Sequence, residues 1–130
     1  MTEFVSYSIL AKEEMLMEII KTVRMGLLHD FYGPLLTPKQ RRCIQLYYEA
    51  DLSLAETAEK FGSSRQAVYD LLKRTEKLLE EYESKLGLLQ KYEEREKRYA
   101  DLLSLVKGNP LEKEVRALVA ELERIETGDI

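Results

Sequence analysis

The chain has 130 residues, of which 45% are hydrophobic and 34% are charged, and its formal net charge at pH 7 is −4. With no tryptophan, three prolines and six glycines, this composition is typical of a soluble, helix-rich domain and excludes a mainly disordered chain. No apolar run is long enough to span a bilayer and no secretory signal opens the chain, so we expect a cytoplasmic protein with no membrane partner. A single cysteine excludes an internal disulfide, and a single histidine leaves no cluster for a metal or cofactor site.

Charge is distributed unevenly along the chain. Residues 1–38 carry three basic and five acidic side chains, residues 39–74 carry seven and five, and residues 75–130 carry ten and fourteen. Only the middle segment is net basic, at +2. This is the pattern expected for a localised contact with phosphates, not for a broad basic surface.

The N-terminal region predicts one helix after an irregular start. Residues 1–14 lack a long periodic apolar pattern and predict a flexible extension, and Met15 and Met17 are alternative natural starts. From there apolar residues recur at three- and four-residue spacing, which predicts an amphipathic helix: Leu16, Ile19, Ile20, Val23, Leu27, Leu28 and Phe31. The Gly-Pro pair at 33–34 ends it. We interpret His29, near the helix end, as a capping or partly packed histidine and not as a catalytic one.

A second helix is predicted over about 38–49. Thr37 is its cap, Pro38 takes the first helical position, and Gln40 completes a capping box. Three cations crowd its first turns, against the helix dipole: Lys39, Arg41 and Arg42. They either contact an anionic partner or form a solvated basic face. Cys43 is predicted to be a small buried apolar residue.

The stretch from Ser53 to Arg74, SLAETAEKFGSSRQAVYDLLKR, predicts two short helices joined at Gly62. A capping box of Ser53 and Glu56 starts the first helix at Leu54. Glycine at position 62 suits a turn that needs a positive φ. Ser63 and Ser64 are alternative caps for the second helix. Together these signals predict a helix-turn-helix.

The second helix of this motif supplies most of the candidate binding residues. Six of its side chains are predicted to face outward: Arg65, Gln66, Tyr69, Asp70, Lys73 and Arg74. In a DNA-binding motif this helix lies in the major groove, where Arg65 can bond guanine and Gln66 adenine, while Lys73 and Arg74 meet phosphates. With Lys39, Arg41 and Arg42, and with Tyr69, these form the candidate nucleic-acid site. The alternative is a structural helical corner with a solvated face.

The helix is predicted to continue well beyond the motif, because no glycine follows until Gly87 and no proline until Pro110. Its apolar residues form a heptad seam: Val68, Leu72, Thr75, Leu79, Tyr82, Leu86 and Leu89. We expect a bend near Gly87 or a change of packing partner around 92–96. A last amphipathic segment, 111–125, either folds back or packs on a second chain.

The end of the seam predicts a homodimer. Four of its residues are expected to project beyond the small domain and to form the dimer interface: Leu79, Tyr82, Leu86 and Leu89. A tail that folds back over them is the alternative. The predicted fold is all-α, a helix-turn-helix bundle of three or four helices with a long C-terminal helix extending from the recognition helix. Its parts are the extension at 1–14, the helix-turn-helix domain at 15–90, and a helical tail at 91–130.

Several blocks of the sequence resemble the YlxM-type helix-turn-helix family. They are KTVRMGLLHDFYGPLLTPKQR at 21–41, LYY at 46–48 with DLSLAETAEKFG behind it, SRQAVYDLLKRTEKLLEEYESKL at 64–86, and LLQKYEER at 88–95. The resemblance implies a regulator associated with the bacterial signal recognition particle. The central region is also distantly similar to the promoter-reading C-terminal domain of sigma factors, in which Arg65, Gln66 and Tyr69 would occupy the DNA-facing side.

The chain departs from this family pattern in three places. Residues 1–16 lie upstream of where such proteins usually begin. Leu71 stands where the family tends to have asparagine, so one polar group on the recognition helix is absent. Beyond about residue 96 the resemblance fades, which leaves the role of the tail to periodicity alone.

The leading hypothesis is therefore a nonenzymatic nucleic-acid-binding regulator. DNA is favoured over RNA because a groove-entering helix fits the B-form major groove and not the deep, narrow groove of RNA. The competing hypothesis is an adaptor whose acidic long helix grips a protein, for instance the signal recognition particle GTPase. We expect no enzyme, because the sequence shows no glycine-rich phosphate loop, no nucleophile with a base, and no metal-ligand set.

Overall fold

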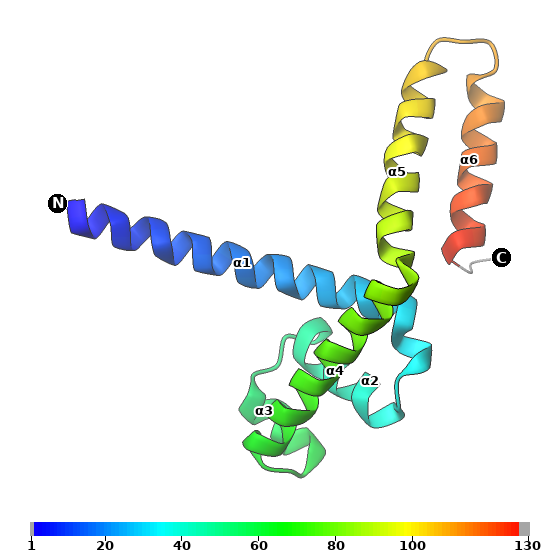
Figure 1. Ribbon diagram of the computed structural model, residues 1–130. Coiled ribbons are helices and arrows are strands. Elements are labelled where there is room, and N and C mark those ends of the chain that lie inside the picture. Colours follow the sequence, from blue (N-terminus) through cyan, green and yellow to red (C-terminus); the bar gives the residue numbers. More distant parts are fainter. Residues whose placement is uncertain (1, 128–130) are drawn as a thin grey trace. The chain divides into compact units, whose positions relative to one another are not determined.

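The computed structural model describes residues 2–127, and side chains for residues 6–126. The described residues form helices and no strands, which confirms the predicted all-α fold (Figure 1). The helices are α1 (Thr2–Tyr32), η1 (Gly33–Leu35), α2 (Pro38–Ile44), η2 (Gln45–Glu49), α3 (Leu54–Phe61), α4 (Arg65–Leu86), α5 (Leu88–Leu105) and α6 (Glu112–Thr127). They divide into two compact units, residues 1–89 and 90–130. None of the described helices is long and apolar enough to cross a membrane.

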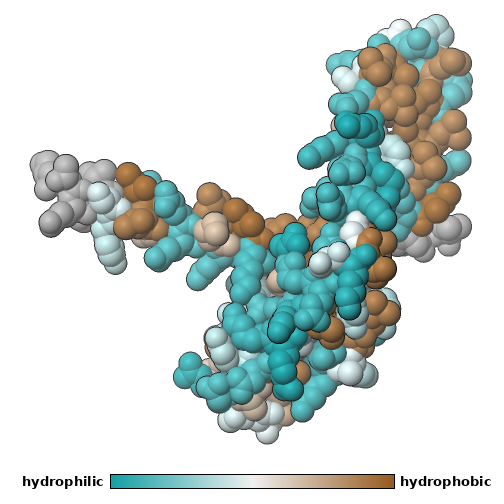
Figure 2. Space-filling model, in the orientation of Figure 1, coloured by the Kyte–Doolittle hydropathy of each residue, from teal (hydrophilic) through white to brown (hydrophobic). Residues whose placement is uncertain are grey.

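Helix α1 begins at Thr2, well before the start predicted near Leu16. Residues 6–24 are all exposed, so this part of the helix packs on no core and needs no core-directed apolar pattern. The packed part comes later, at Met25, Leu28 and Tyr32, which are buried. The predicted stripe from Leu16 to Val23 lies at the surface, and Figure 2 shows apolar side chains along this helix. Of the predicted stripe, Leu28 is buried and Leu27 and Phe31 are half-buried, so tertiary packing uses only the C-terminal end of that stripe, together with Met25 and Tyr32.

The second predicted helix is formed as α2 followed directly by η2, a π-helical turn closed by a 2.8 Å bond from Ala50 N–H to Gln45 O. Both bonds of the Thr37–Gln40 capping box are present. Cys43 is fully buried, as predicted, and burial raises the pKa of its thiol to about 11. This cysteine is a core residue.

The helix-turn-helix forms as the sequence predicts. The capping box on Ser53 starts α3 at Leu54, and Gly62 ends α3 with a left-handed φ of 64°. Of the two alternative caps for α4, the structure uses Ser64, whose hydroxyl accepts the Ala67 N–H at 3.1 Å. Ala58, Val68 and Leu72 are buried and close the small core between α3 and α4.

Helix α4 ends at Leu86, and Gly87 takes a left-handed φ of 62° before α5 begins, so the expected bend lies at this glycine. The premise of the predicted dimer interface is wrong, because Leu79 is 0% exposed and Leu89 is 1% exposed. Tyr82 is half-buried, with its ring 5.8 Å from that of Tyr32. Only Leu86, at 48%, is exposed as expected. The end of α1 packs on α4, so the buried part of this row needs no second chain.

In the second unit, α6 folds back beside α5 as a helical hairpin (Figure 1). Gly108 takes a φ of 79° in the turn between them. The Tyr99 hydroxyl donates to Glu126 at 3.1 Å, Arg95 pairs with the same carboxylate, and Val119 is buried. The C-terminal segment therefore folds back beside α5 of the same unit, which is one of the two arrangements that its periodicity allowed.

Candidate nucleic-acid interface

The N-terminal half of α4 presents a mainly basic outer face. The six residues predicted to face outward are all exposed: Arg65, Gln66, Tyr69, Asp70, Lys73 and Arg74. Lys77, one turn beyond Lys73, is exposed as well. Over residues 65–77, all of which the structure describes, four exposed cations accompany a single exposed acid, Asp70. The backbone positions this face firmly, because α4 is capped at its start and its other side packs on α2 and α3.

Contacts within this face hold several side chains. Gln66 donates an amide N–H to Asp70 at 3.0 Å, and Arg74 Nε donates to the Asp70 carbonyl at 3.4 Å. Lys73 lies 5.5 Å from the centre of the Tyr69 ring. These contacts are exposed and therefore weak. Gln66 would have to leave Asp70 before it could bond a base edge.

The three cations of α2 have different surroundings. Lys39 lines a shallow groove of about 270 Å³ together with Arg74. Arg42 donates to the Lys60 carbonyl at 3.2 Å and lies 5.1 Å above the Phe61 ring, so it ties α2 to the end of α3. Arg41 is exposed. The structure thus joins Lys39 to the basic face of α4 and gives Arg42 a structural contact.

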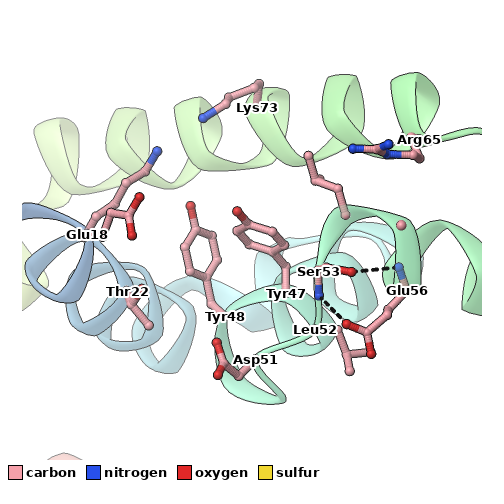
Figure 3. Close-up of a pocket in the computed structure, with 13 residues that line it drawn as sticks. Glu18, Thr22, Tyr47, Tyr48, Asp51, Leu52, Ser53, Glu56, Arg65 and Lys73 are labelled. Carbon is pink, nitrogen blue, oxygen red and sulfur yellow. Dashed lines mark hydrogen bonds between the residues drawn. The ribbon is translucent and has the colours of Figure 1, made fainter. Parts of the chain in front are cut away.

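A cleft of about 760 Å³ lies on the other flank of α4 (Figure 3). Arg65 and Lys73 of α4 face Tyr47 and Tyr48 of η2 across it. The further charged side chains lining the cleft are Lys21, Glu18, Asp51 and Glu56. Cations and acids are equal in number there, so the cleft attracts an anion less than the outer face of α4 does.

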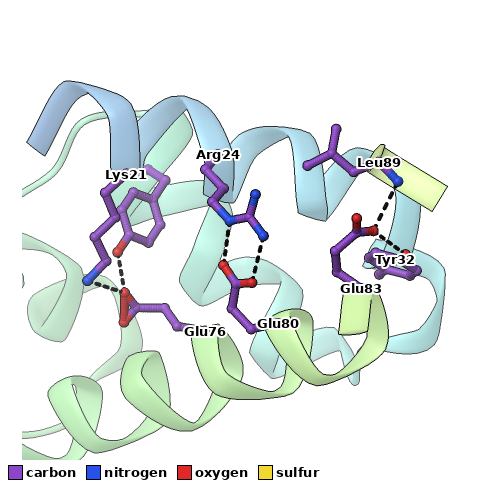
Figure 4. A network of polar contacts seen from close by, with 8 residues as sticks. Lys21, Arg24, Tyr32, Glu76, Glu80, Glu83 and Leu89 are labelled. Atoms are coloured by element: carbon purple, nitrogen blue, oxygen red, sulfur yellow. Dashed lines mark hydrogen bonds and ion pairs between the residues drawn. The ribbon is translucent and has the colours of Figure 1, made fainter. Parts of the chain in front are cut away.

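Glu76 of α4 joins three elements through its contacts to Lys21 of α1 and Tyr48 of η2 (Figure 4). Its carboxylate accepts the Tyr48 hydroxyl and pairs with Lys21 at 2.8 Å and with Lys73 at 3.4 Å. Burial works to raise the pKa of Glu76, but bonds from Lys21 and Tyr48 outweigh it, so the pKa is lowered. Burial and then the bond to Glu76 raise the pKa of Tyr48. Glu76 is therefore a buried carboxylate that holds Lys73 at the base of the binding face.

Side chains of α1 bind two more acids of α4 (Figure 4). Arg24 donates both Nε and Nη2 to Glu80, at 2.7 and 2.8 Å. The Tyr32 hydroxyl donates to Glu83 at 2.6 Å, and Glu83 also accepts the Leu89 N–H at 3.0 Å. With Glu76, these contacts fix α1 along α4 and engage three acids of α4, whereas Glu81 of α4 and Glu93 and Glu94 of α5 are exposed.

Sequence reasoning missed Lys77 and Lys21. Lys77 could have been found, because it continues the exposed row one turn after Lys73. Lys21 could not, since it reaches the cleft only through the packing of α1 on α4. The resulting surface has an exposed basic face on one helix and a charge-balanced cleft beside it.

The structure also brings together three potential metal ligands, His29, Asp30 and Glu49, whose ligand atoms lie within 4.8 Å of one another. His29 Nδ1 is 2.9 Å from Glu49 Oε1, and the imidazole is buried. An ordinary hydrogen bond between α1 and η2 accounts for this geometry, in line with a packed histidine. Asp30 and Glu49 are exposed acids, which commonly lie near one another without an ion.

Comparison with known proteins agrees with this architecture. The family model described as UPF0122, "Putative helix-turn-helix protein, YlxM / p13 like", matches residues 19–118. The UPF0122 protein YlxM of Bacillus subtilis is 49% identical over 110 residues, which cover 85% of this chain and all of that protein. UPF0122 proteins of Listeria welshimeri and Bacillus thuringiensis are 50% and 51% identical over 107 residues, 82% of this chain and 97% of each relative.

The match extends beyond residue 96, so the expectation that the resemblance fades there is wrong. It takes in α5, the turn after it, and the first part of α6. It also contains every residue of the basic face of α4. The chain therefore belongs to the YlxM/p13-like helix-turn-helix family.

Proposed function

We propose that this protein is a nonenzymatic nucleic-acid-binding regulator whose helix α4 enters the major groove of duplex DNA. The observation that carries the proposal is the capped start of α4, with Arg65, Lys73, Arg74 and Lys77 exposed on its outer side. An α-helix fits the width of the B-form major groove. In such a complex the first residues of the helix reach base edges and later ones reach phosphates.

The roles of these residues follow from their positions. Arg65 is the first residue of α4 and acts as a base reader, since a guanidinium can bond guanine in bidentate fashion. Lys73, Arg74 and Lys77 lie two to three turns later and meet the backbone. Lys39 extends this phosphate contact from α2, through the groove that it shares with Arg74.

The structure gives less support to the adaptor alternative in its original form. That hypothesis needs acids of the long helix to face a protein partner. Glu76, Glu80 and Glu83 are bound within the chain, which leaves exposed acids such as Glu81, Glu93 and Glu94 for that role. The association with the signal recognition particle, as RNA ligand or through its GTPase, remains part of the proposal on family resemblance alone. Such a regulator would act in the cytoplasm, where these partners lie.

The test is a titration of fluorescent duplex DNA with the full chain at several salt concentrations, using randomised duplexes to select a preferred site. For the wild type we expect affinity to fall steeply with salt, because phosphate contacts release counterions. Arg65→Ala should weaken the selected site by roughly 10- to 100-fold, about 1–3 kcal/mol, and relax its sequence preference. Lys73→Ala should weaken all duplexes alike and reduce the salt slope by about one.

Lys113→Ala, which removes an exposed lysine of α6, is the matched control and should leave binding unchanged. A parallel titration with signal recognition particle RNA separates the two ligands. If the RNA binds and the duplexes do not, RNA is the ligand; if Arg65→Ala and Lys73→Ala behave like the control on every nucleic acid, the proposed face is wrong.

A further inference from the structure

Helix α1 carries an apolar seam on the side opposite to its own packing face. Successive helical residues are rotated by about 100°, which places Met25, Leu28 and Tyr32 on the side that packs on α4. The opposite side carries Ile9, Leu16, Ile20, Val23 and Leu27. The first four of these expose between 51% and 57% of their surface. The helix is thus apolar on two sides, one covered and one open.

The open side has the spacing of a coiled-coil seam. Its positions recur in alternating steps of four and three: Ile9, Glu13, Leu16, Ile20, Val23 and Leu27. Glu13 is the only polar residue among them. A sustained alternation of this kind is the pattern by which one helix packs its side chains between those of another helix.

The helix also needs a partner over this stretch. Residues 6–24 are exposed throughout, and the contacts that Lys21 and Arg24 make with α4 leave the apolar seam side of the helix exposed. Helices gain most of their stability in water from the packing of an apolar face, and isolated ones are marginal. A second helix along the seam would supply that packing.

We propose that the occupant is a second copy of this chain, with the two α1 helices antiparallel about residue 18. The seam is self-complementary in that arrangement. Ile9 meets the partner's Leu27, Leu16 meets the partner's Ile20, and each contact is repeated by the two-fold axis. In the third layer, Glu13 meets the partner's Val23. Each layer pairs a position at the start of a four-residue step with one at the end of such a step, as antiparallel pairing requires. Formation of this dimer does not require nucleic-acid binding. Its contacts involve none of the residues of the heptad seam that runs from Val68 to Leu89.

Sedimentation equilibrium of the full chain, from about 5 to 200 μM, tests the state. We expect a reversible dimer in the wild type. Leu16→Asp/Ile20→Asp should weaken it by at least about 100-fold, because four charges per dimer enter the seam. Met15→Asp, equally exposed but outside the seam, is the matched control and should dimerise normally. Glu13→Leu should tighten the dimer by roughly tenfold.

Disulfide trapping tests the orientation. Under mild oxidation an equimolar mixture of Leu16→Cys and Ile20→Cys chains should give the mixed dimer in excess over either homodimer, because position 16 of one chain faces position 20 of the other. Cys43 is buried and should not react. Homodimers in excess would indicate a parallel pair and overturn the antiparallel model. A wild-type chain that stays monomeric at 200 μM, or a double-aspartate variant that dimerises like Met15→Asp, would overturn the proposal as a whole.

Discussion

The two halves of α4 show how differently one helix can use its charges. In its N-terminal part, over residues 65–77, Arg65, Lys73, Arg74 and Lys77 are exposed with one exposed acid among them. Toward the C-terminal end, α1 binds three of the acids that appear in the sequence as a negative surface, Glu76, Glu80 and Glu83, whereas Glu81 is exposed. The net charge of −4 therefore does not describe the binding face. A sequence charge becomes a surface charge only where no neighbouring element neutralises it.

The largest expected effect comes from the packed half. Leu79→Ala should lower the free energy of unfolding by about 2–5 kcal/mol, because it leaves a cavity at a fully buried site. Leu86→Ala, on the same half but exposed, should cost less than about 1 kcal/mol. Urea unfolding followed by circular dichroism measures both. Equal losses would mean that the second half of α4 is not held by packing as the structure shows.

Glu76→Gln should have the next largest effect. It should lower the free energy of unfolding by roughly 1–3 kcal/mol, because it removes the charge from the bonds to Lys21 and Tyr48. The pKa of Glu76 is lowered in the folded state, so its stabilisation is complete above the ordinary value of 4.5 and is lost as pH falls below it. Between pH 6 and pH 3.5 the wild type should therefore lose more stability than Glu76→Gln.

Urea unfolding of both proteins at the two pH values measures this difference. Glu81→Gln, which changes an exposed acid of the same helix, should lose as much stability as the wild type on acidification. A wild type and a Glu76→Gln variant with equal losses would show that Glu76 makes no pH-dependent contribution.

The smallest expected effect lies in the exposed half. Asp70→Asn should tighten binding to duplex DNA by roughly two- to fivefold, less than about 1 kcal/mol, because it removes the only exposed acid among residues 65–77 and loosens Gln66. Glu81→Gln again serves as the control and should bind like the wild type. Fluorescence anisotropy at low salt measures both, and weaker binding by Asp70→Asn would indicate that Asp70 positions Gln66 for base contact.

Local signals in the sequence predicted local structure well. The capping boxes at Thr37 and Ser53, the left-handed turn at Gly62 and the break at Gly87 all lie where the sequence places them. Each depends on side chains within a few residues of the backbone groups that they satisfy. Between Ser63 and Ser64, however, the sequence left the cap of α4 open, because either hydroxyl can reach the first turn.

Contacts between elements were less predictable. Periodicity identified the apolar stripe of α1 and the seam of α4, but it could not show which of them another helix covers. The structure buries Leu79 and Leu89, expected at a dimer interface, and exposes Leu16 and Ile20, expected in a packed stripe. A hydrophobic pattern has the same spacing whether its partner belongs to the same chain or to another.

The sequence by itself determined the all-α fold, the helix-turn-helix, and the outward position of Arg65, Gln66, Tyr69, Lys73 and Arg74, because helical periodicity and capping are local properties of the chain. Tertiary structure alone decided which acids of α4 are bound by α1. Lys21 reaches Glu76, and Arg24 reaches Glu80, across more than fifty positions of sequence. No local rule relates residues so far apart, and only the packing of α1 on α4 brings them within bonding distance.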